Sequence, residues 1–170
     1  KGLGNANKMM NRLLAANKDI AHIASLAGGS LRNAIPREST ATVVVKTQDI
    51  SEFVLQMEKI QFNLVEEYRL LEPDLTIETQ KIDAPQMVMA PKDQTAFINA
   101  VYATHNGVYR MSPAIEGLVE TSNNIAKISV KDATLKIECL TRSSVDSSKD
   151  DMAATLTSVF ELAGYDVDCS

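Results

Sequence analysis

Residues 40–71 read TATVVVKTQDISEFVLQMEKIQFNLVEEYRLL, a strand pattern followed directly by a helix pattern. The β-branched run Val43-Val44-Val45 predicts a strand over residues 40–47. Apolar residues then recur at helical spacing over residues 53–71, so they would line one face of a long helix that Pro73 ends. Helix and strand in direct succession indicate a domain of the α/β type.

Similar patterns extend in both directions along the chain. Apolar spacing predicts three further helices, at residues 5–17, at residues 91–104, and from a cap at Ser147 or Ser148 to Gly164. Alternating or β-rich runs predict further strands at residues 20–26, 75–81, 126–130, 135–140 and 165–169, with a hairpin turn over 131–134. The short apolar segment 87–89 is a further candidate strand.

The order helix–strand–strand–helix–strand therefore occurs twice, in residues 5–81 and 91–169. One more strand before each first helix would make each half a split β-α-β unit of the ferredoxin-like type. We therefore expect an α/β (two-layer α+β) fold, with an antiparallel sheet and helices mainly on one face. The two ferredoxin-like halves would be pseudo-repeats, residues 1–83 and 84–170.

The composition is that of a globular domain and argues against several classes of protein. Hydrophobic residues make up 45% of the 170 residues and the net charge is −5, so neither a membrane span nor a basic nucleic-acid surface is expected. Cys139 and Cys169 are too few for a disulfide scaffold and indicate reduced thiols in a cytoplasmic protein, with a disulfide between them left open. Because the chain starts at Lys1 and ends in a strand pattern, we expect a piece of a longer protein.

A complete hydrolase would show a catalytic constellation, and the sequence shows none. His22 and His105 have no partner at metal-ligand spacing, and no zinc-peptidase helix motif, nucleophile elbow or phosphate-binding loop occurs. We expect His22 to be a packed or surface histidine and His105 to be a turn residue. No catalytic residue and no metal ligand are therefore predicted in this chain.

Two polar segments are candidates for contact with a ligand. In LRNAIPRE, residues 31–38, Pro36 fixes the backbone and Asn33 could turn its amide toward a ligand, although the residue types alone favour an ordinary β-turn. Arg142 ends an apolar strand, where its guanidinium could bind a carboxylate through two hydrogen bonds. Composition alone favours an exposed strand-end arginine at this position.

Five segments of the chain, taken in order, resemble the lid domain of bacterial aminoacyl-histidine dipeptidases. They are Gly4–Lys8, Leu31–Glu38, Asn106–Ser112, Gly117–Asn124 and Arg142–Ser144. Each segment is short, but together they run through nearly the whole chain. In that family the lid is inserted into a zinc-peptidase catalytic domain, which carries the metal ligands and the catalytic glutamate.

The resemblance implies substrate-binding roles for three residues. Asn33 falls on an Asn-apolar-Ile-Pro motif whose asparagine contacts substrate in the broader peptidase superfamily, and Arg142 falls on a strand arginine that holds the substrate carboxylate. Asn124 is the analogue of Asn33 in the second half, although Ile125-Ala126 departs from the Ile-Pro pattern. A duplicated lid would thus supply Asn33 and Arg142 from one chain.

The parent enzyme implied by the resemblance is a cytoplasmic metallo-dipeptidase that hydrolyses short dipeptides, with Xaa-His as the favoured class. Two zinc or other divalent ions would lie in its own catalytic domain, outside this chain. The implied partners are the dipeptide substrate and that catalytic domain, with a homodimer left open. Two alternatives stay open as well: a stand-alone ferredoxin-like ligand-binding or regulatory module, and a structural dimerisation domain.

Overall fold

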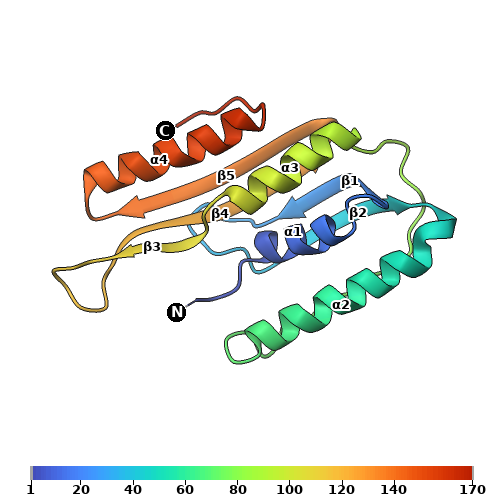
Figure 1. Ribbon diagram of the computed structural model, residues 1–170, viewed down its shortest axis with the longest axis horizontal. Coiled ribbons are helices and arrows are strands. Elements are labelled where there is room, and N and C mark those ends of the chain that lie inside the picture. The colour runs from blue at the N-terminus through green and yellow to red at the C-terminus, as the bar shows by residue number, and fades with distance from the viewer. Residues whose placement is uncertain (1, 170) are drawn as a thin grey trace.

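The computed structural model in Figure 1 describes residues 2–169. Within these residues it contains four α-helices, five strands and one short 3-10 helix, η1. In chain order the elements are α1 (Ala6–Ala16), β1 (Ala21–Gly28), β2 (Ser39–Val45), η1 (Thr47–Asp49), α2 (Ile50–Tyr68), α3 (Pro91–Ala103), β3 (Gly107–Met111), β4 (Val119–Lys131), β5 (Thr134–Ser143) and α4 (Asp146–Leu162). No helix in this part of the chain has the length and apolar character needed to cross a membrane.

The five strands form one antiparallel sheet in which β4 has the most neighbours. β2, β1 and β4 lie side by side in that order, and β5 pairs with β4 from Thr121 to Lys131. β1 and β3 share the other edge of β4, with β1 along its C-terminal part and β3 along its N-terminal part. The antiparallel sheet predicted from the sequence is confirmed.

Helices cover one face of this sheet and enclose the main core. α1 contacts β1, β2 and β4, α3 contacts β1, and α4 contacts β4 and β5 (Figure 1). Ile23, Phe97 and Ile125 are fully buried in one cluster, so both halves of the chain contribute to the same core. The two-layer α/β class is confirmed. The order helix–strand–strand–helix occurs once, as α1–β1–β2–α2, because the second half has the additional strand β3 and runs α3–β3–β4–β5–α4.

α2 confirms the predicted long helix but is less buried than its apolar spacing indicates. Leu64 is fully buried against α1, whereas Val54 and Val65 of the same helix stay exposed. The reason is the position of the helix, because α2 packs chiefly beside α1 (Figure 1). Only the side chains that point at α1 are therefore removed from water.

The N-terminal ends of α1 and α4 are fixed in different ways. Asn5 caps α1, because its Oδ1 accepts hydrogen bonds from the backbone N–H groups of Asn7 (2.9 Å) and Lys8 (3.2 Å). α4 begins after Val145, so the predicted cap at Ser147 or Ser148 is wrong. Ser148 lies in the first turn of α4, and its hydroxyl donates to Glu120 instead (3.3 Å).

Two predicted strands, residues 75–81 and 165–169, are wrong, since neither segment is a strand in the structure. Leu75 and Ile77 nevertheless pack against the cluster between α1 and α2. Alternating apolar residues report burial on one side, but a strand also needs a neighbouring backbone that exchanges hydrogen bonds with it. The candidate strand at 87–89 is not a strand either, although the N–H of Met89 donates to the carbonyl of Ile23 (2.6 Å).

The remaining strands differ from their predictions mainly in length. β4 starts at Val119, seven residues before the predicted start at 126, because its polar first part pairs with both β3 and β5. β3 was not predicted, since all five of its residues are exposed and give no burial pattern. The predicted hairpin between β4 and β5 is confirmed, with its tight turn at Asp132 and Ala133.

Replacing Ala133 with glycine is expected to stabilise the domain. Asp132 and Ala133 have φ values of 51° and 59°, a left-handed conformation that this kind of hairpin turn requires. An L-residue with a Cβ is disfavoured there by roughly 1 kcal/mol and glycine is not, so Ala133→Gly should raise the free energy of unfolding by about that amount. Urea unfolding followed by circular dichroism measures the change, and Ala133→Val is the opposite control, expected to lower stability.

Candidate functional site

The loop of residues 29–38 carries Asn33 and starts where the backbone passes close to β4. Gly29 has a φ of +76°, and a Cβ at this position would lie 1.9 Å from the carbonyl oxygen of Ala126. Only glycine satisfies both constraints. The N–H of Gly29 also donates to the carbonyl of Glu38 (3.2 Å), so the two ends of the loop are joined.

The second half of the loop is anchored to the start of α1. Pro36 is buried, and its carbonyl accepts a hydrogen bond from the N–H of Ala6 (3.0 Å). Both terminal nitrogens of Arg37 bind the Glu72 carboxylate, which also accepts from the N–H of Gly4 (3.0 Å). These hydrogen bonds lower the pKa of Glu72, and the bond from Arg37 has the largest effect. The carboxylate therefore stays ionised and holds the loop near neutral pH.

Asn33 lies in the exposed first half of the same loop. The turn around it is closed by a hydrogen bond from the N–H of Ala34 to the carbonyl of Leu31 (3.3 Å). The carbonyl of Ala34 in turn accepts from Nδ2 of Asn124 in β4 (2.7 Å). The backbone beside Asn33 is thus fastened to a strand of the other half of the chain.

Arg142 is exposed near the C-terminal end of β5, opposite Ser122 of β4. The residue after it, Ser143, shares a hydrogen bond with the hydroxyl of Thr121 (2.9 Å) and accepts another from the N–H of Val145 (3.1 Å). These bonds fix the backbone on the C-terminal side of Arg142, where the chain turns from β5 into α4.

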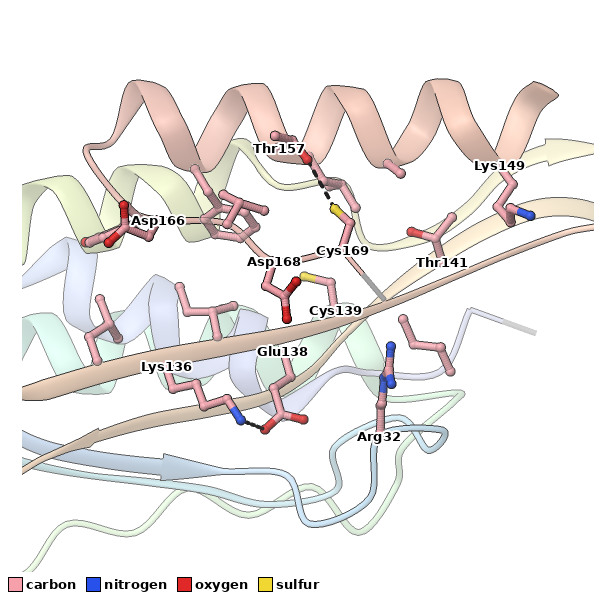
Figure 2. A pocket seen from close by; sticks show the side chains of 18 of the residues that line it. Arg32, Lys136, Glu138, Cys139, Thr141, Lys149, Thr157, Asp166, Asp168 and Cys169 are labelled. Atoms are coloured by element: carbon pink, nitrogen blue, oxygen red, sulfur yellow. Dashed lines mark hydrogen bonds and ion pairs between the residues drawn. The ribbon is translucent and has the colours of Figure 1, made fainter. Parts of the chain in front are cut away.

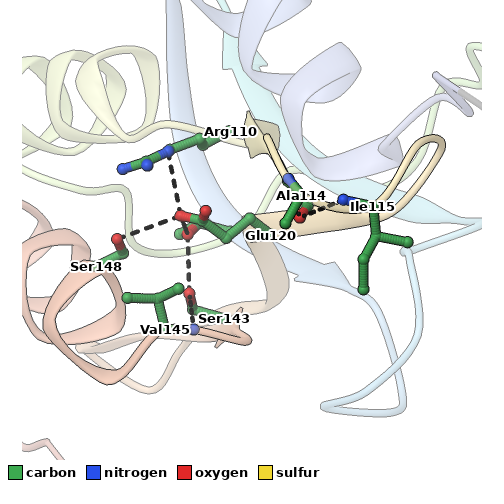
Figure 3. Close-up of polar contacts among 9 residues, drawn as sticks. Arg110, Ala114, Ile115, Glu120, Ser143, Val145 and Ser148 are labelled. Atoms are coloured by element: carbon green, nitrogen blue, oxygen red, sulfur yellow. Dashed lines mark hydrogen bonds and ion pairs between the residues drawn. The ribbon is translucent and has the colours of Figure 1, made fainter.

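A buried carboxylate reinforces the same turn. Figure 3 shows Arg110 of β3 and Ser148 of α4 pointing at Glu120 of β4, which is 4% exposed. Nε of Arg110 lies 3.2 Å from its carboxylate, and the N–H of Ser144 donates to its backbone carbonyl (2.9 Å). This role could not be predicted from the sequence, because the partners of Glu120 lie on β3, on α4 and in the turn between β5 and α4.

Asn33 and Arg142 are brought to the same side of the sheet. Ser122 and Asn124 are two residues apart in β4, so their side chains share a face, and Arg142 shares it because it lies opposite Ser122. This face, opposite the helices, is called the open face below. The loop of Asn33 lies against it, because Asn124 holds that loop. The structure therefore places Arg142 and the loop of Asn33, which are distant in the sequence, on the same side of the sheet.

Basic residues predominate on the open face near Arg142. Figure 2 shows Arg32 and Glu138 on the side of β5 away from α4. Nζ of Lys136 lies 3.0 Å from the Glu138 carboxylate, and Lys127 contacts it at 4.0 Å. The pKa of Glu138 is lowered chiefly by its hydrogen bond with Lys136. The positive charges of Lys127, Lys136 and Arg32 lower it further. With several cations around one carboxylate, this surface suits a ligand that carries a negative charge.

Asn124 is tied to protein groups at both ends of its side chain. Its Oδ1 accepts from Nδ2 of Asn5 (3.1 Å) while its Nδ2 donates to Ala34. The contact with substrate predicted for Asn124 stays a prediction. The observed contacts are with the loop of Asn33 and with the cap of α1.

Neither histidine belongs to a group of three or more potential metal ligands within residues 2–169. His22 is half-buried on β1, and the ring of His105 contacts the edge of the Tyr109 ring at 5.4 Å between centroids. Within residues 2–169 no group of three or more His, Cys, Asp or Glu side chains could hold a metal ion. The described residues offer groups for binding and positioning, and no resident metal fits them.

Comparison with known proteins relates this arrangement to two bacterial enzymes. The chain is 36% identical over 165 residues to the cytosol non-specific dipeptidase of Escherichia coli (strain K12). The matched region covers 96% of this chain and 34% of that protein. Its structure matches the crystal structure of aminoacylhistidine dipeptidase from Vibrio alginolyticus with a TM-score of 0.95 and 36% identity, over 99% of this chain and 35% of that one. A search of protein-family models found no match.

This chain is homologous to a segment that makes up about one third of each of these two dipeptidases. The resemblance that rests on the five ordered sequence segments is thereby confirmed, and so is the fold class. The chain spans about a third of the length of both relatives, so each of them contains roughly twice as much additional chain.

A cavity separates β5 from the C-terminal segment of this dipeptidase-like domain. It has a volume of about 890 Å³ and is lined by β5, by α4 and by residues 164–169 (Figure 2). Cys139 faces it from β5, and Cys169 faces it from the other side, with its sulfur 3.5 Å from the hydroxyl of Thr157. Both cysteines are free, as the sequence indicated. Burial raises the pKa of the Cys139 thiol to about 11.

The two thiols are expected to react at very different rates with a thiol reagent. Only the thiolate reacts, and at pH 8 a thiol with a pKa of about 11 is ionised to roughly one part in a thousand. In a Cys169→Ser variant, the remaining Cys139 should react slowly with Ellman's reagent at pH 8 and faster as the pH approaches 11. Cys139→Ser is the matched control, and its exposed Cys169 should react quickly. Equal rates for the two variants would contradict the buried position of Cys139.

Proposed function

We propose that this chain is the lid domain of a cytoplasmic, metal-dependent dipeptidase and that it caps the bound dipeptide with Asn33 and Arg142. The observation that supports this most directly is the hydrogen bond from Asn124 to Ala34 (2.7 Å). It holds the loop of Asn33 at the open face of the strand pair that carries Arg142. The reaction class, hydrolysis of dipeptides, is proposed from the two homologous dipeptidases, in each of which the matched segment is about a third of the chain.

Arg142 would bind the C-terminal carboxylate of the dipeptide. A guanidinium presents two parallel N–H donors that match the two oxygens of a carboxylate. The basic surroundings on the open face, with Lys127, Lys136 and Arg32 near one glutamate, add a field that attracts an anion. Recognition of a free carboxylate would restrict the enzyme to short peptides whose C-terminus reaches this residue.

Asn33 would act on the peptide bond itself. Its side-chain amide donates hydrogen bonds and carries no charge, so it can orient the scissile carbonyl and stabilise the oxygen as negative charge develops on it. The anchored loop holds the backbone on both sides of Asn33 in place. A donor that is already oriented contributes more to catalysis than a mobile one.

The metal ions of such an enzyme do not fit residues 2–169, because these residues contain no suitable cluster of ligands. Zinc or another divalent ion, and the catalytic glutamate, would belong to the remaining two thirds of the parent protein. That part would be the catalytic domain on which this lid closes. Preference for Xaa-His dipeptides is proposed from the Vibrio alginolyticus relative, an aminoacylhistidine dipeptidase.

Replacing Arg142 tests the proposed carboxylate contact in the full-length enzyme. Arg142→Ala should lower kcat/KM for a dipeptide by about 10- to 100-fold, as expected for the loss of hydrogen bonds to a charged group. The same substitution should change kcat/KM little for the corresponding dipeptide amide, which has no carboxylate. Steady-state kinetics with both substrates gives the ratio, and Arg142→Lys should restore only part of it.

Arg12→Ala is the matched control for this substitution. Arg12 forms an ion pair with Glu67 at 2.7 Å, in the helical layer between α1 and α2. It should leave the ratio between dipeptide and amide unchanged. If Arg142→Ala retained the wild-type ratio, Arg142 would not be the carboxylate ligand.

The purified chain alone is expected to hydrolyse no dipeptide and to retain no stoichiometric zinc. The reason is that the described residues carry groups for binding but no ligand cluster for a metal. Activity assays with a panel of dipeptides and metal analysis by mass spectrometry test this. Dipeptide hydrolysis by the purified chain would contradict the proposed division of labour.

A further inference from the structure

Three asparagine side chains meet where α1, β4 and the residue before β3 come together. Nδ2 of Asn5 lies within hydrogen-bonding distance of Oδ1 of Asn106 (2.9 Å), Oδ1 of Asn124 (3.1 Å) and the carbonyl of Ile125 (3.1 Å). Asn5 is 3% exposed, so its amide cannot turn to water for other partners. Its Oδ1 is occupied by the cap of α1.

Each amide in this group has its orientation set by its neighbours. Oδ1 of Asn106 also accepts from the N–H of Ile125 (2.9 Å), so it must face β4. Because Oδ1 of Asn124 accepts from Asn5, Nδ2 of Asn124 has to point the other way, toward the carbonyl of Ala34. Rotating the Asn124 amide by half a turn would place two donors face to face at Asn5 and two acceptors face to face at Ala34.

The group therefore ends beside the residue proposed to contact the scissile carbonyl. Ala34 directly follows Asn33, and the other anchors, at Pro36 and Arg37, act on the far side of the loop. Asn124 belongs to β4, which pairs with β5 and places Arg142 opposite Ser122. The bond from Asn124 to Ala34 thus sets the position of Asn33 relative to Arg142.

We propose that Asn124, oriented by Asn5 and Asn106, is a positioning residue that acts through Asn33; this inference rests on the proposed lid function. It assigns Asn124 a role different from the direct substrate contact expected from the sequence. Binding of the carboxylate by Arg142 does not depend on this bond. Loss of the bond should therefore lower kcat and leave KM nearly unchanged.

Asn124→Asp in the full-length enzyme removes the tether to Ala34 and keeps the contact with Asn5. The carboxylate keeps an acceptor for Asn5 but has no donor for Ala34, and its charge repels that carbonyl. We expect kcat to fall by roughly 10- to 100-fold, the range that a displacement of about 1 Å causes in other enzymes. Asn99→Asp is the matched control, because it makes the same chemical change at an exposed position of α3 and should leave kcat unchanged.

A double-mutant cycle with Asn33→Ala separates positioning from direct contact. If Asn124 acts through Asn33, Asn124→Asp should have little further effect on kcat once Asn33 is alanine. Equal effects in both backgrounds would overturn the proposal in favour of a direct contact, and an unchanged kcat in the single variant would overturn it as well. Failure of the lid function itself would show differently, as unchanged kcat/KM in Asn33→Ala and Arg142→Ala.

Hydrogen exchange measured by mass spectrometry supplies a readout that does not depend on turnover. In Asn124→Asp the peptide that contains residues 30–36 should exchange faster, while peptides from α3 keep the wild-type rate. If Asn124→Asp folds poorly, Asn124→Ser serves instead, since its hydroxyl is too short to reach Ala34. Unchanged exchange at 30–36 in a folded variant would show that the bond does not hold the loop.

Discussion

Three residue pairs between β1 and β4 hold the two halves of the chain together, Leu26 to Gly28 on one strand and Ile128 to Val130 on the other. The main-chain hydrogen bonds of this seam continue the sheet from one half into the next. Above the seam, Ile23 and Ile125 share a core with Phe97. Because β1 must lie against β4 here, the chain leaves β1 at Gly29 in contact with Ala126, and the loop of Asn33 starts at that point.

Polar side chains are buried along the same seam and make its arrangement specific. Nδ2 of Asn7 donates to the carbonyls of Gly28 and Ile125, one from each strand, and Nδ2 of Asn11 donates to Ile98 of α3. A buried amide that loses its partner destabilises a protein by about 1–3 kcal/mol, so a shifted pairing of the halves would be disfavoured. Apolar contacts alone would tolerate such a shift more easily, because they have no preferred direction.

This seam also explains how the proposed lid would contribute to catalysis. Asn33 and Arg142 come from different halves, and their separation is set by β-sheet pairing and by one side-chain bond.

The features that depend on residues a few positions apart could be predicted from the sequence. These are the four helices, the cap at Asn5, the strands β1, β2 and β5, the core of β4 and the hairpin turn, since helical spacing, β-branched runs and turn residues act locally. The candidates Asn33 and Arg142 also came from the sequence, but only through resemblance, because their residue types alone favoured ordinary surface positions.

Which segments pair and which polar residues meet could be seen only in the folded chain. Residues 75–81 have the alternating apolar pattern of a strand but pair with no other strand within residues 2–169. β3 pairs with β4 but has no alternating burial pattern. Glu120 and Asn124 gain their contacts from elements distant in the sequence, Arg110 and Ser148 in one case and Asn5 and Ala34 in the other. A hydrogen bond requires both of its groups in place, and a local pattern specifies only one of them.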